Sequence, residues 1–404
     1  MRKSESRKSV SSKSVSKIGE VVSPARFRSL EGGVVASMDL LIGTYTEGTD
    51  ALGIYGVVVS SEGSSQAIAL DIPVRNPSFL AIHPSLPILY VVEELGEGEG
   101  GGLVSAFSWN GSGFSLLSRQ SSLGEDPCHL SISPDGQLLA VANYSTGSVV
   151  VFILDDEGGI HGDPVVIEHQ IEFQRRVGEA GRHSERQQQP HAHFSQWVGP
   201  RTVLVCDLGT DQVYRYDCQG FDQMDEKKTC SLVRSMTWTL PRGVGPRHAV
   251  LDEKVRRLWV LAELSNEVFC LSAEGDRVIS RQTTIAADDK RFNEAAEIEW
   301  RSIDRTLWVS NRGADELVKF DVGPNSELTL STRVAVPAYP RHFSWSDDDL
   351  WVACRDPGQV LCFRQTTDQK KFEQIVAVNV PSAVCVLPLA NTPLGEQLLA
   401  NRDL

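Results

Sequence analysis

A unit of about fifty residues recurs along this sequence, and this repeat restricts the possible folds more than any other feature. Each copy opens with a proline or an alanine, runs through a short β-forming segment and a polar turn, and reaches a hairpin tip. The opening residue and the tip residue are 17 positions apart in four copies, 18 in one and 15 in another. The copies open at Pro77, Pro127, Pro190, Pro246, Ala295 and Pro340.

The segments within these units follow strand patterns rather than helical ones. Apolar β-forming runs such as 258–261 are frequent, and a helical period is nearly absent. A seventh unit opens at Pro381 with only one strand left before the C-terminus, so its other strands must come from 39–46 and 53–60. Closure of the ring by strands from both ends explains how so many short strands avoid exposing their edges. We therefore predict an all-β fold, a seven-bladed β-propeller with N- and C-terminal strands in one blade.

The composition changes sharply near residue 38. Residues 1–37 contain eight Lys or Arg, three Glu and ten Ser, whereas the whole chain carries a formal charge of −14. Such a basic, Ser-rich segment without apolar periodicity is typical of a disordered tail, and an organelle-targeting segment is the alternative. We expect residues 38–390 to form the propeller and 391–404 a C-terminal tail.

Charge and cysteine spacing exclude several classes of function. The 53 Asp and Glu against 39 Lys and Arg argue against a nucleic-acid partner. No apolar run reaches the roughly 18 residues that a membrane span needs. The eight cysteines include no CxxC pair, which argues against a zinc site and a disulfide framework and predicts a reducing, cytoplasmic setting. The pair His191 and His193 has no third ligand nearby, so we predict no metal.

Equivalent positions of the units predict which side chains meet at one end of the ring. In a propeller the innermost strand of each blade lines the central axis, and its start opens on one face together with the hairpin tip. Side chains of a strand alternate, so His193 should share the face of His191, whereas His129, His248 and His342 should face the other way as packed groups. The residues after the openings are Ser78, Cys128, His191, Arg247, Ala296, Arg341 and Ser382, and the tip residues are Glu94, Tyr144, Leu208, Glu263, Arg312 and Arg355.

These positions gather arginines, glutamates and histidines, which indicates an anion site with acid–base groups. Arginine offers a planar fork of donors for carboxylate or phosphate, and a cluster of arginines is costly unless an anion is held. Glu263 or His193 could transfer protons near neutral pH if neighbouring groups adjust its pKa. The alternative is that the pairs Arg247–Glu263 and Arg312–Glu94 are ion pairs that only join blades.

Seven short motifs in order resemble a known family. They are Ile42-Gly43-Thr44-Tyr45-Thr46, Pro190-His191-Ala192-His193, Asp207-Leu208-Gly209-Thr210-Asp211, Gly245-Pro246-Arg247-His248, Ala262-Glu263-Leu264, Ser310-Asn311-Arg312-Gly313 and Pro340-Arg341-His342-Phe343. Over residues 39–388 the sequence resembles the seven-bladed lactonases, which include 6-phosphogluconolactonases of the cycloisomerase 2 type and the fungal 3-carboxy-cis,cis-muconate lactonizing enzyme. Two departures stand out: the copy that opens at Ala295 reads Ala295-Ala296-Glu297, and the insertion 168–189 is particular to this chain.

The resemblance implies roles for individual residues. It assigns catalysis to His193, Arg247, Glu263 and Arg312. The repeat adds substrate-binding candidates, among which Arg341 or Arg355 would hold a phosphate; they are His191, Arg341, Arg355 and Glu94.

The activity that the resemblance implies is a lactonase, a carboxylic ester hydrolase. Its expected substrate is 6-phospho-D-glucono-1,5-lactone, which is hydrolysed to 6-phosphogluconate in the pentose phosphate pathway without metal or cofactor. Arg247 or Arg312 would stabilise the oxyanion, and Glu263 or His193 would take the proton of water. Cycloisomerisation of a carboxymuconate and a non-catalytic binding propeller are the alternatives. We expect a small anionic lactone as partner, neither nucleic acid nor membrane, and the sequence gives no oligomeric state.

Overall fold

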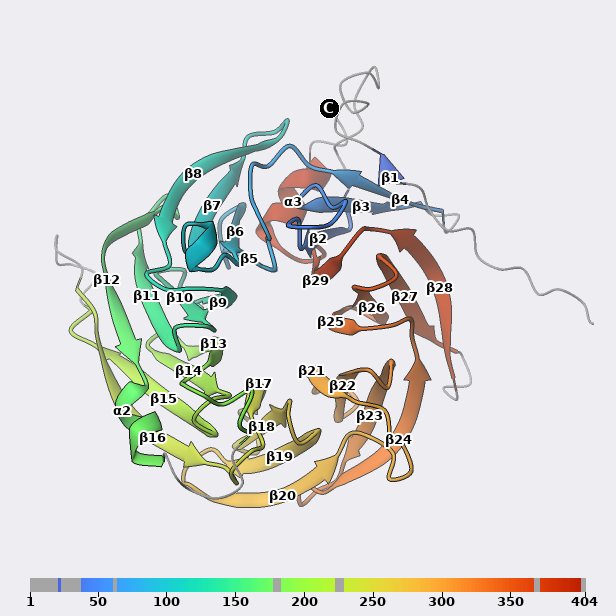
Figure 1. Cartoon of the computed structure of the whole chain (residues 1–404). Helices are drawn as coiled ribbons and strands as arrows, with labels where there is room; N and C mark the ends of the chain where they lie inside the picture. Colours follow the sequence, from blue (N-terminus) through green and yellow to red (C-terminus); the bar gives the residue numbers. More distant parts are fainter. Residues whose placement is uncertain are drawn as a thin grey trace, which may run out of the picture.

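Seven β-sheets stand around one central axis (Figure 1). This computed structural model describes residues 21–22, 38–60, 64–176, 183–221, 229–366 and 371–400. The prediction of an all-β, seven-bladed propeller is confirmed. Of the predicted basic tail 1–37, all but Val21–Val22 lies outside the described residues.

One sheet joins the two ends of the chain. Strand β29 is its innermost strand and pairs antiparallel with β2, so that Leu40 faces Pro388 and Ile42 faces Val386. This pairing closes the ring, as the sequence predicted. In spatial order the sheet contains β1 (Val21–Val22), β4 (Ser65–Ala69), β3 (Tyr55–Val59), β2 (Leu40–Thr44) and β29 (Ala383–Pro388).

Each of the other six sheets has four antiparallel strands in chain order, with the first strand innermost (Figure 1). They comprise β5 (Phe79–Ile82), β6 (Ile88–Glu93), β7 (Leu103–Trp109) and β8 (Phe114–Ser121); β9 (Pro127–Ile132), β10 (Leu138–Asn143), β11 (Ser148–Leu154) and β12 (Ile160–Glu168); β13 (Ala192–Gly199), β14 (Thr202–Asp207), β15 (Gln212–Gln219) and β16 (Ser231–Thr239); β17 (Pro246–Asp252), β18 (Arg257–Ala262), β19 (Glu267–Ser272) and β20 (Val278–Thr283); β21 (Glu294–Arg301), β22 (Thr306–Arg312), β23 (Glu316–Val322) and β24 (Leu328–Ala335); β25 (Pro340–Ser346), β26 (Asp349–Cys354), β27 (Gln359–Gln365) and β28 (Phe372–Asn379).

The hydrophobic core lies between neighbouring sheets. Seven buried apolar clusters occupy the seven blade-to-blade interfaces of the described chain. Middle strands such as β10 and β22 are buried along their whole length, because each sheet packs against a neighbour on both faces. This explains why these segments read as continuous apolar runs in the sequence. The interfaces hold each innermost strand at a fixed distance from the axis.

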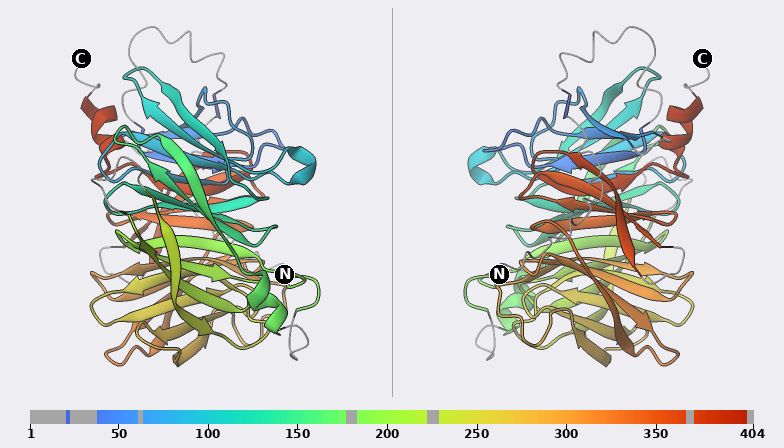
Figure 2. Two further views of the ribbon diagram at one scale, coloured as in Figure 1. Left: turned by 90° about the vertical axis from the view of Figure 1, so that its left-hand side faces the viewer. Right: turned by 90° about the vertical axis from the view of Figure 1, so that its right-hand side faces the viewer.

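Among the described residues, three short helices lie at the two ends of the propeller (Figure 2). The 3₁₀ helix η1 (Glu97–Glu99) and helix α2 (Gln170–Arg176) connect strands on the face where the innermost strands begin, which we call the mouth. Helix α3 (Pro393–Ala400) lies on the opposite face and falls within the segment expected to be a C-terminal tail. No helix among the described residues is long and apolar enough to cross a membrane.

The cysteines differ from expectation at one pair. The sequence predicted no disulfide framework, but the structure joins Cys218 of β15 to Cys230, with their Cα atoms 5.8 Å apart. Adjacent antiparallel strands bring these residues together, a proximity that the 12-residue spacing does not reveal. The other six cysteines are buried thiols.

Helix α3 provides a test of the C-terminal boundary. Leu394 is fully buried in a cluster with Met38 and Leu89, whereas Leu399 of the same helix is 52% exposed. We predict that Leu394→Ala lowers the free energy of unfolding by about 2–5 kcal/mol, because it leaves a cavity. The matched change Leu399→Ala should shift it by less than about 0.5 kcal/mol. Equal, negligible effects in chemical denaturation would show that this segment is a dispensable tail.

Candidate active site

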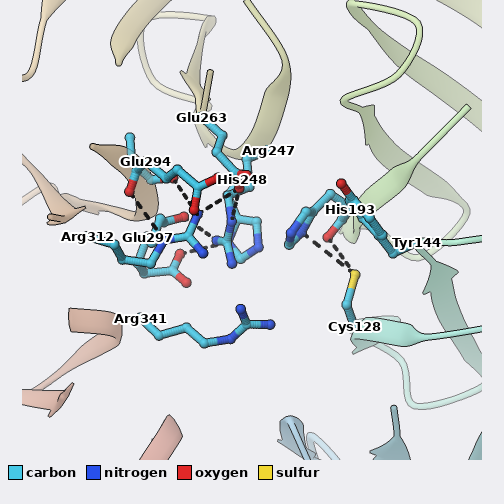
Figure 3. Close-up of polar contacts among 12 residues, drawn as sticks. Cys128, Tyr144, His193, Arg247, His248, Glu263, Glu294, Glu297, Arg312 and Arg341 are labelled. Atoms are coloured by element: carbon cyan, nitrogen blue, oxygen red, sulfur yellow. Dashed lines mark hydrogen bonds and ion pairs between the residues drawn. The ribbon is translucent and has the colours of Figure 1, made fainter. Parts of the chain in front are cut away.

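Polar and charged side chains from several blades converge on the axis at the mouth (Figure 3). Arg247, Glu263 and Arg312 form one ion-pair cluster. His193 lies across from it, and Arg341 extends into the site from the blade next to that of Arg312 (Figure 3). All three residues of the cluster are less than 5% exposed. The structure thus brings together the four residues to which the resemblance assigned catalysis.

An extra residue near the start of the innermost strands sets the direction of these side chains. In β17, Pro246 pairs with Ala262 and His248 with Leu261, so Arg247 is left opposite no partner. A β-bulge of this kind breaks the alternation of a strand and turns the extra side chain. The same irregularity recurs in four other blades and in the closing strand, where the extra residues are Cys128, His193, Arg341, Val384 and one of Ala296 and Glu297.

This register corrects the alignment of the third unit, which opens at Pro190. In β13, Ala192 pairs with Asp207 and takes the place that Pro246 has in β17, so His193 and not His191 is equivalent to Arg247. His191 precedes the strand, and its ring stacks on Tyr144 at 4.5 Å between centroids. Its Nδ1 lies 3.0 Å from the backbone oxygen of Tyr144. His191 therefore supports the hairpin tip beside His193.

Glu263 is the centre of the cluster. Its Oε2 lies 2.8 Å from Nη2 of Arg312 and 3.0 Å from Nε of Arg247, and its Oε1 accepts a hydrogen bond from Arg186 at 2.5 Å. Burial alone would raise the pKa of this carboxyl, but the charges of the three arginines outweigh burial and lower it to about 2. Glu263 is therefore a permanent anion that holds arginines from three segments.

The two buried arginines differ in how many of their nitrogens already donate hydrogen bonds within the protein. Arg312 uses Nε and Nη2 on the backbone oxygens of Glu294 and Ala295, and Nη1 on the hydroxyl of Tyr339 at 3.4 Å. Arg247 donates Nη1 to the oxygen of Ala296, and its Nη2 has no hydrogen-bond partner within the described ranges. Burial and the neighbouring Arg312 lower the pKa of Arg247 to about 10, so the group remains charged near neutral pH. Arg247 can therefore donate to a substrate oxygen.

His193 stands beside this donor as a neutral imidazole. Burial, followed by the charges of Arg247 and of other neighbours, lowers its pKa well below 6.5. Its Nδ1 lies 3.7 Å from Sγ of Cys128, and Nε2 has no hydrogen-bond partner among the residues that the structure describes. The ring of Tyr144 packs edge-on against it at 5.4 Å.

The remaining predicted residues lie on the neighbouring side of the mouth. Arg341 pairs with Glu94 at 3.6 Å, and Glu94 also accepts a hydrogen bond of 2.8 Å from the hydroxyl of Tyr45. The alternative pairing of Glu94 with Arg312 is not found among the described contacts. Arg355 pairs with the adjacent Asp356 and stacks on Tyr339, with 3.6 Å from its guanidinium carbon to the ring centroid. The guanidinium of Arg341 extends into the site (Figure 3).

A second layer of histidines lies directly beneath this site. Oε1 of Glu297 is 3.0 Å from Nδ1 of His248, and Oε2 is 3.4 Å from Nε2 of His342. The rings of His129 and His248 contact each other at 5.3 Å. The expectation that these three histidines face away from the axis is wrong, because the bulge breaks the alternation on which it rested. They are packed, hydrogen-bonded groups, as expected.

Sequence reasoning missed Arg186 and its partner Glu294 at the mouth. Arg186 belongs to the insertion before β13 and donates hydrogen bonds to Glu263 and Glu294, and to the hydroxyl of Tyr144 at 3.2 Å. The insertion has no counterpart in the other units, so the repeat could not place Arg186. Its only signal in the sequence is a basic residue close to the Pro190 motif.

Known proteins match this chain over the length of the propeller. Residues 39–388 match the family described as "Lactonase, 7-bladed beta-propeller". The chain belongs to this lactonase family. It is 29% identical over 356 residues to the 6-phosphogluconolactonase of Bacillus subtilis, covering 85% of this chain and 96% of that protein. The resemblance predicted from the motifs is thereby confirmed, and so is the prediction of a lactonase enzyme.

Two solved structures share the architecture of this lactonase. A putative 6-phosphogluconolactonase from Bacteroides fragilis superposes with a TM-score of 0.75 at 26% identity, covering 88% of this chain and 99% of that one. A periplasmic gluconolactonase from Pseudomonas aeruginosa gives 0.73 at 26% identity, covering 86% and 98%. Both likenesses extend over the whole propeller rather than over a few blades.

The donor set of the lactonase consists of arginines, glutamates and histidines joined to one another. Among the described residues, no group of three or more His, Cys, Asp or Glu side chains is arranged to hold a metal ion. The arginines are paired with the chain's own glutamates, so the sequence argument that such a cluster requires a bound anion needs revision. The groups that remain available to a substrate include the Nη2 donor of Arg247 and the basic Nε2 of His193.

We predict that Glu263→Gln destabilises the lactonase by about 3–5 kcal/mol at pH 7, because buried arginines then lose their counter-ion. The folded-state pKa of Glu263 is depressed, so its stabilisation is present above 4.5 and is lost as pH falls through about 2. The difference between wild type and variant, measured by chemical denaturation, should therefore shrink in acid. Glu274, with 65% of its side chain exposed, serves as control: Glu274→Gln should change stability by less than about 0.5 kcal/mol. Equal effects at the two positions would contradict this assignment.

Proposed function

We propose that this lactonase hydrolyses 6-phospho-D-glucono-1,5-lactone to 6-phosphogluconate. The observation that carries the proposal is that a neutral histidine, His193, and a charged arginine, Arg247, both lie at the mouth, each with a nitrogen that makes no hydrogen bond to a described residue. Ester hydrolysis needs a base for water and a donor for the oxyanion. The names of the Bacillus subtilis relative and of the Bacteroides fragilis neighbour support this substrate.

His193 rather than Glu263 is the base in this proposal. Both oxygens of Glu263 are held by arginines, and a carboxylate with a pKa of about 2 has little affinity for a proton. The thiol of Cys128 lies near the backbone oxygens of Ala142 and His193, so it can donate its hydrogen to a carbonyl and accept from Nδ1–H of His193. We assign this tautomer, which leaves the lone pair of His193 on Nε2.

The reaction then needs two proton transfers. Nε2 of His193 takes a proton from water as the water oxygen bonds to the lactone carbonyl carbon, and Arg247 donates through Nη2 to the resulting oxyanion. The tetrahedral centre collapses, the ring carbon–oxygen bond breaks, and the imidazolium returns its proton to the departing ring oxygen. The new carboxylic acid ionises near neutral pH. Arg341, which makes an ion pair but no hydrogen bond among the described residues, offers donors to other substrate oxygens.

The pH dependence of kcat/KM tests the choice of base. Because the pKa of His193 lies well below 6.5, the imidazole is already neutral at pH 6.5, and it gains a proton only in more acid solution. We predict that kcat/KM, corrected for spontaneous hydrolysis, stays level from pH 8 to 6.5 and falls only below. The substrate phosphate titrates near pH 6. A pH-dependent change in kcat/KM that is seen with the phosphorylated lactone but not with glucono-1,5-lactone therefore belongs to the substrate. If kcat/KM falls by half at or above pH 6.5 with both lactones, His193 is not the base.

Substitution of the base provides a second test. We predict that His193→Gln lowers kcat by about 10²–10⁴-fold, the contribution of a positioned general base, at an unchanged melting temperature. His161→Gln is the matched control, because His161 lies near the start of β12, at the end opposite the mouth, with 66% of its side chain exposed, and should leave the rate as in wild type. Activity of wild type only on a carboxymuconate would favour cycloisomerisation. Turnover of neither substrate would favour the binding propeller.

A further inference from the structure

The insertion between β12 and β13 places one arginine at the outer edge of the site. Arg186 contacts the carboxylates of Glu263 and Glu294, which belong to two different blades. It also contacts the hydroxyl of Tyr144, whose ring packs against His193. Tyr144 therefore contacts both Arg186 and the proposed base, His193.

The neighbouring residue fixes the segment that carries Arg186. Gln187 is fully buried and donates through Nε2 to the oxygen of Leu208 at 2.8 Å and to Oδ1 of Asp211 at 2.7 Å. Its own Oε1 accepts from the backbone nitrogen of His183 at 2.8 Å. A buried side chain with both ends bonded determines the path of the backbone around it. The hydrogen bonds of Gln187 therefore hold in place the backbone segment that carries Arg186 at the mouth.

Arg186 also decides the charge of the mouth. The arginines there are Arg186, Arg247, Arg312 and Arg341, and the glutamates that pair with them are Glu94, Glu263 and Glu294. Four cations therefore face three anions. Glu297 lies deeper and is bonded to His248. Without Arg186 the arginines and glutamates of the mouth would balance, so the surplus positive charge that an anionic substrate meets depends on the insertion.

The other arginines suit a distal anion less well. The side chains of Arg247 and Arg312 are 3% and 4% exposed, and that of Arg341 is 14% exposed beside Glu94, whereas that of Arg186 is 30% exposed. Arg355 is as exposed, at 32%, but its Nε and Nη2 pair with the adjacent Asp356 and its guanidinium stacks on Tyr339. Among the described contacts it reaches neither Glu263 nor Tyr144, whereas Arg186 contacts both. Nε of Arg186 has no hydrogen-bond partner among the described residues, so one edge of its guanidinium is available to a phosphate.

We propose that Arg186 is a specificity residue of this lactonase, which binds the phosphate of the lactone at the outer edge of the site while the ester is hydrolysed at His193 and Arg247. This inference rests on the proposed function. It assigns to the insertion the preference for a phosphorylated over an unphosphorylated sugar lactone.

The test compares two lactones in two variants. For wild type, Arg186→Gln and Arg186→Lys, kcat and KM are measured with 6-phosphoglucono-1,5-lactone and with glucono-1,5-lactone. Arg186→Gln should lower the ratio of the two kcat/KM values by about 10- to 100-fold, the loss expected for a charge-assisted hydrogen bond, mainly through KM of the phosphorylated lactone. Arg186→Lys should recover part of the ratio, because it keeps the charge but not the fork.

Arg201→Gln is the matched control. Arg201 has 27% of its side chain exposed, is paired with Asp135 at 2.6 Å, and lies in the β13–β14 turn at the end opposite the mouth. It should leave the ratio unchanged, which excludes an effect of net charge. If Arg186→Gln lowers kcat/KM equally for both lactones, or for neither, the inference is overturned.

A binding measurement separates this inference from the proposed function. Calorimetry with 6-phosphogluconate and gluconate requires no turnover. If wild type hydrolyses neither lactone, the proposed function fails, and the binding result still decides the role of Arg186. Weaker binding of 6-phosphogluconate alone in Arg186→Gln, by at least about tenfold, supports a phosphate contact. Unchanged binding in a variant that melts as wild type overturns it.

Discussion

The pairing of β2 with β29 is the constraint on which the rest of the structure depends. It joins the first and last strands of the propeller, and the seven apolar interfaces then fix every innermost strand relative to the axis. Residues as far apart in the sequence as Tyr45 and Arg341 meet only because the ring is closed. A closed ring also leaves the blades few ways to move independently, which suits a site made of single residues from many blades.

Two local features convert this ring into a polar site. The extra residue in the innermost strands directs Arg247, His193 and Arg341 toward the mouth, where an uninterrupted strand would alternate. The buried carboxylate of Glu263 then compensates the positive charges of the arginines that gather in this buried region. In this account Glu263 organises the cations, and the proton is left to a neutral histidine whose pKa the same cations depress.

The sequence predicted the fold and the main site positions because both follow from a regular repeat. The constant spacing from opening to tip brought Arg247, Glu263 and Arg312 to one end without knowledge of any contact. It could not reveal which arginine pairs with which glutamate, since that depends on side-chain reach across blades. The layer around His248 was misplaced because a bulge leaves no mark in hydrophobic alternation. Arg186 escaped because it comes from a segment without a counterpart in the repeat.

The most direct test of the central claim is a crystal structure of the protein with 6-phosphogluconate bound. The account predicts that the C1 carboxylate lies within hydrogen-bond distance of Nε2 of His193 and Nη2 of Arg247, with Glu263 still enclosed by its arginines. A product bound at the opposite end of the axis, or at the mouth with its carboxylate away from His193, would contradict it.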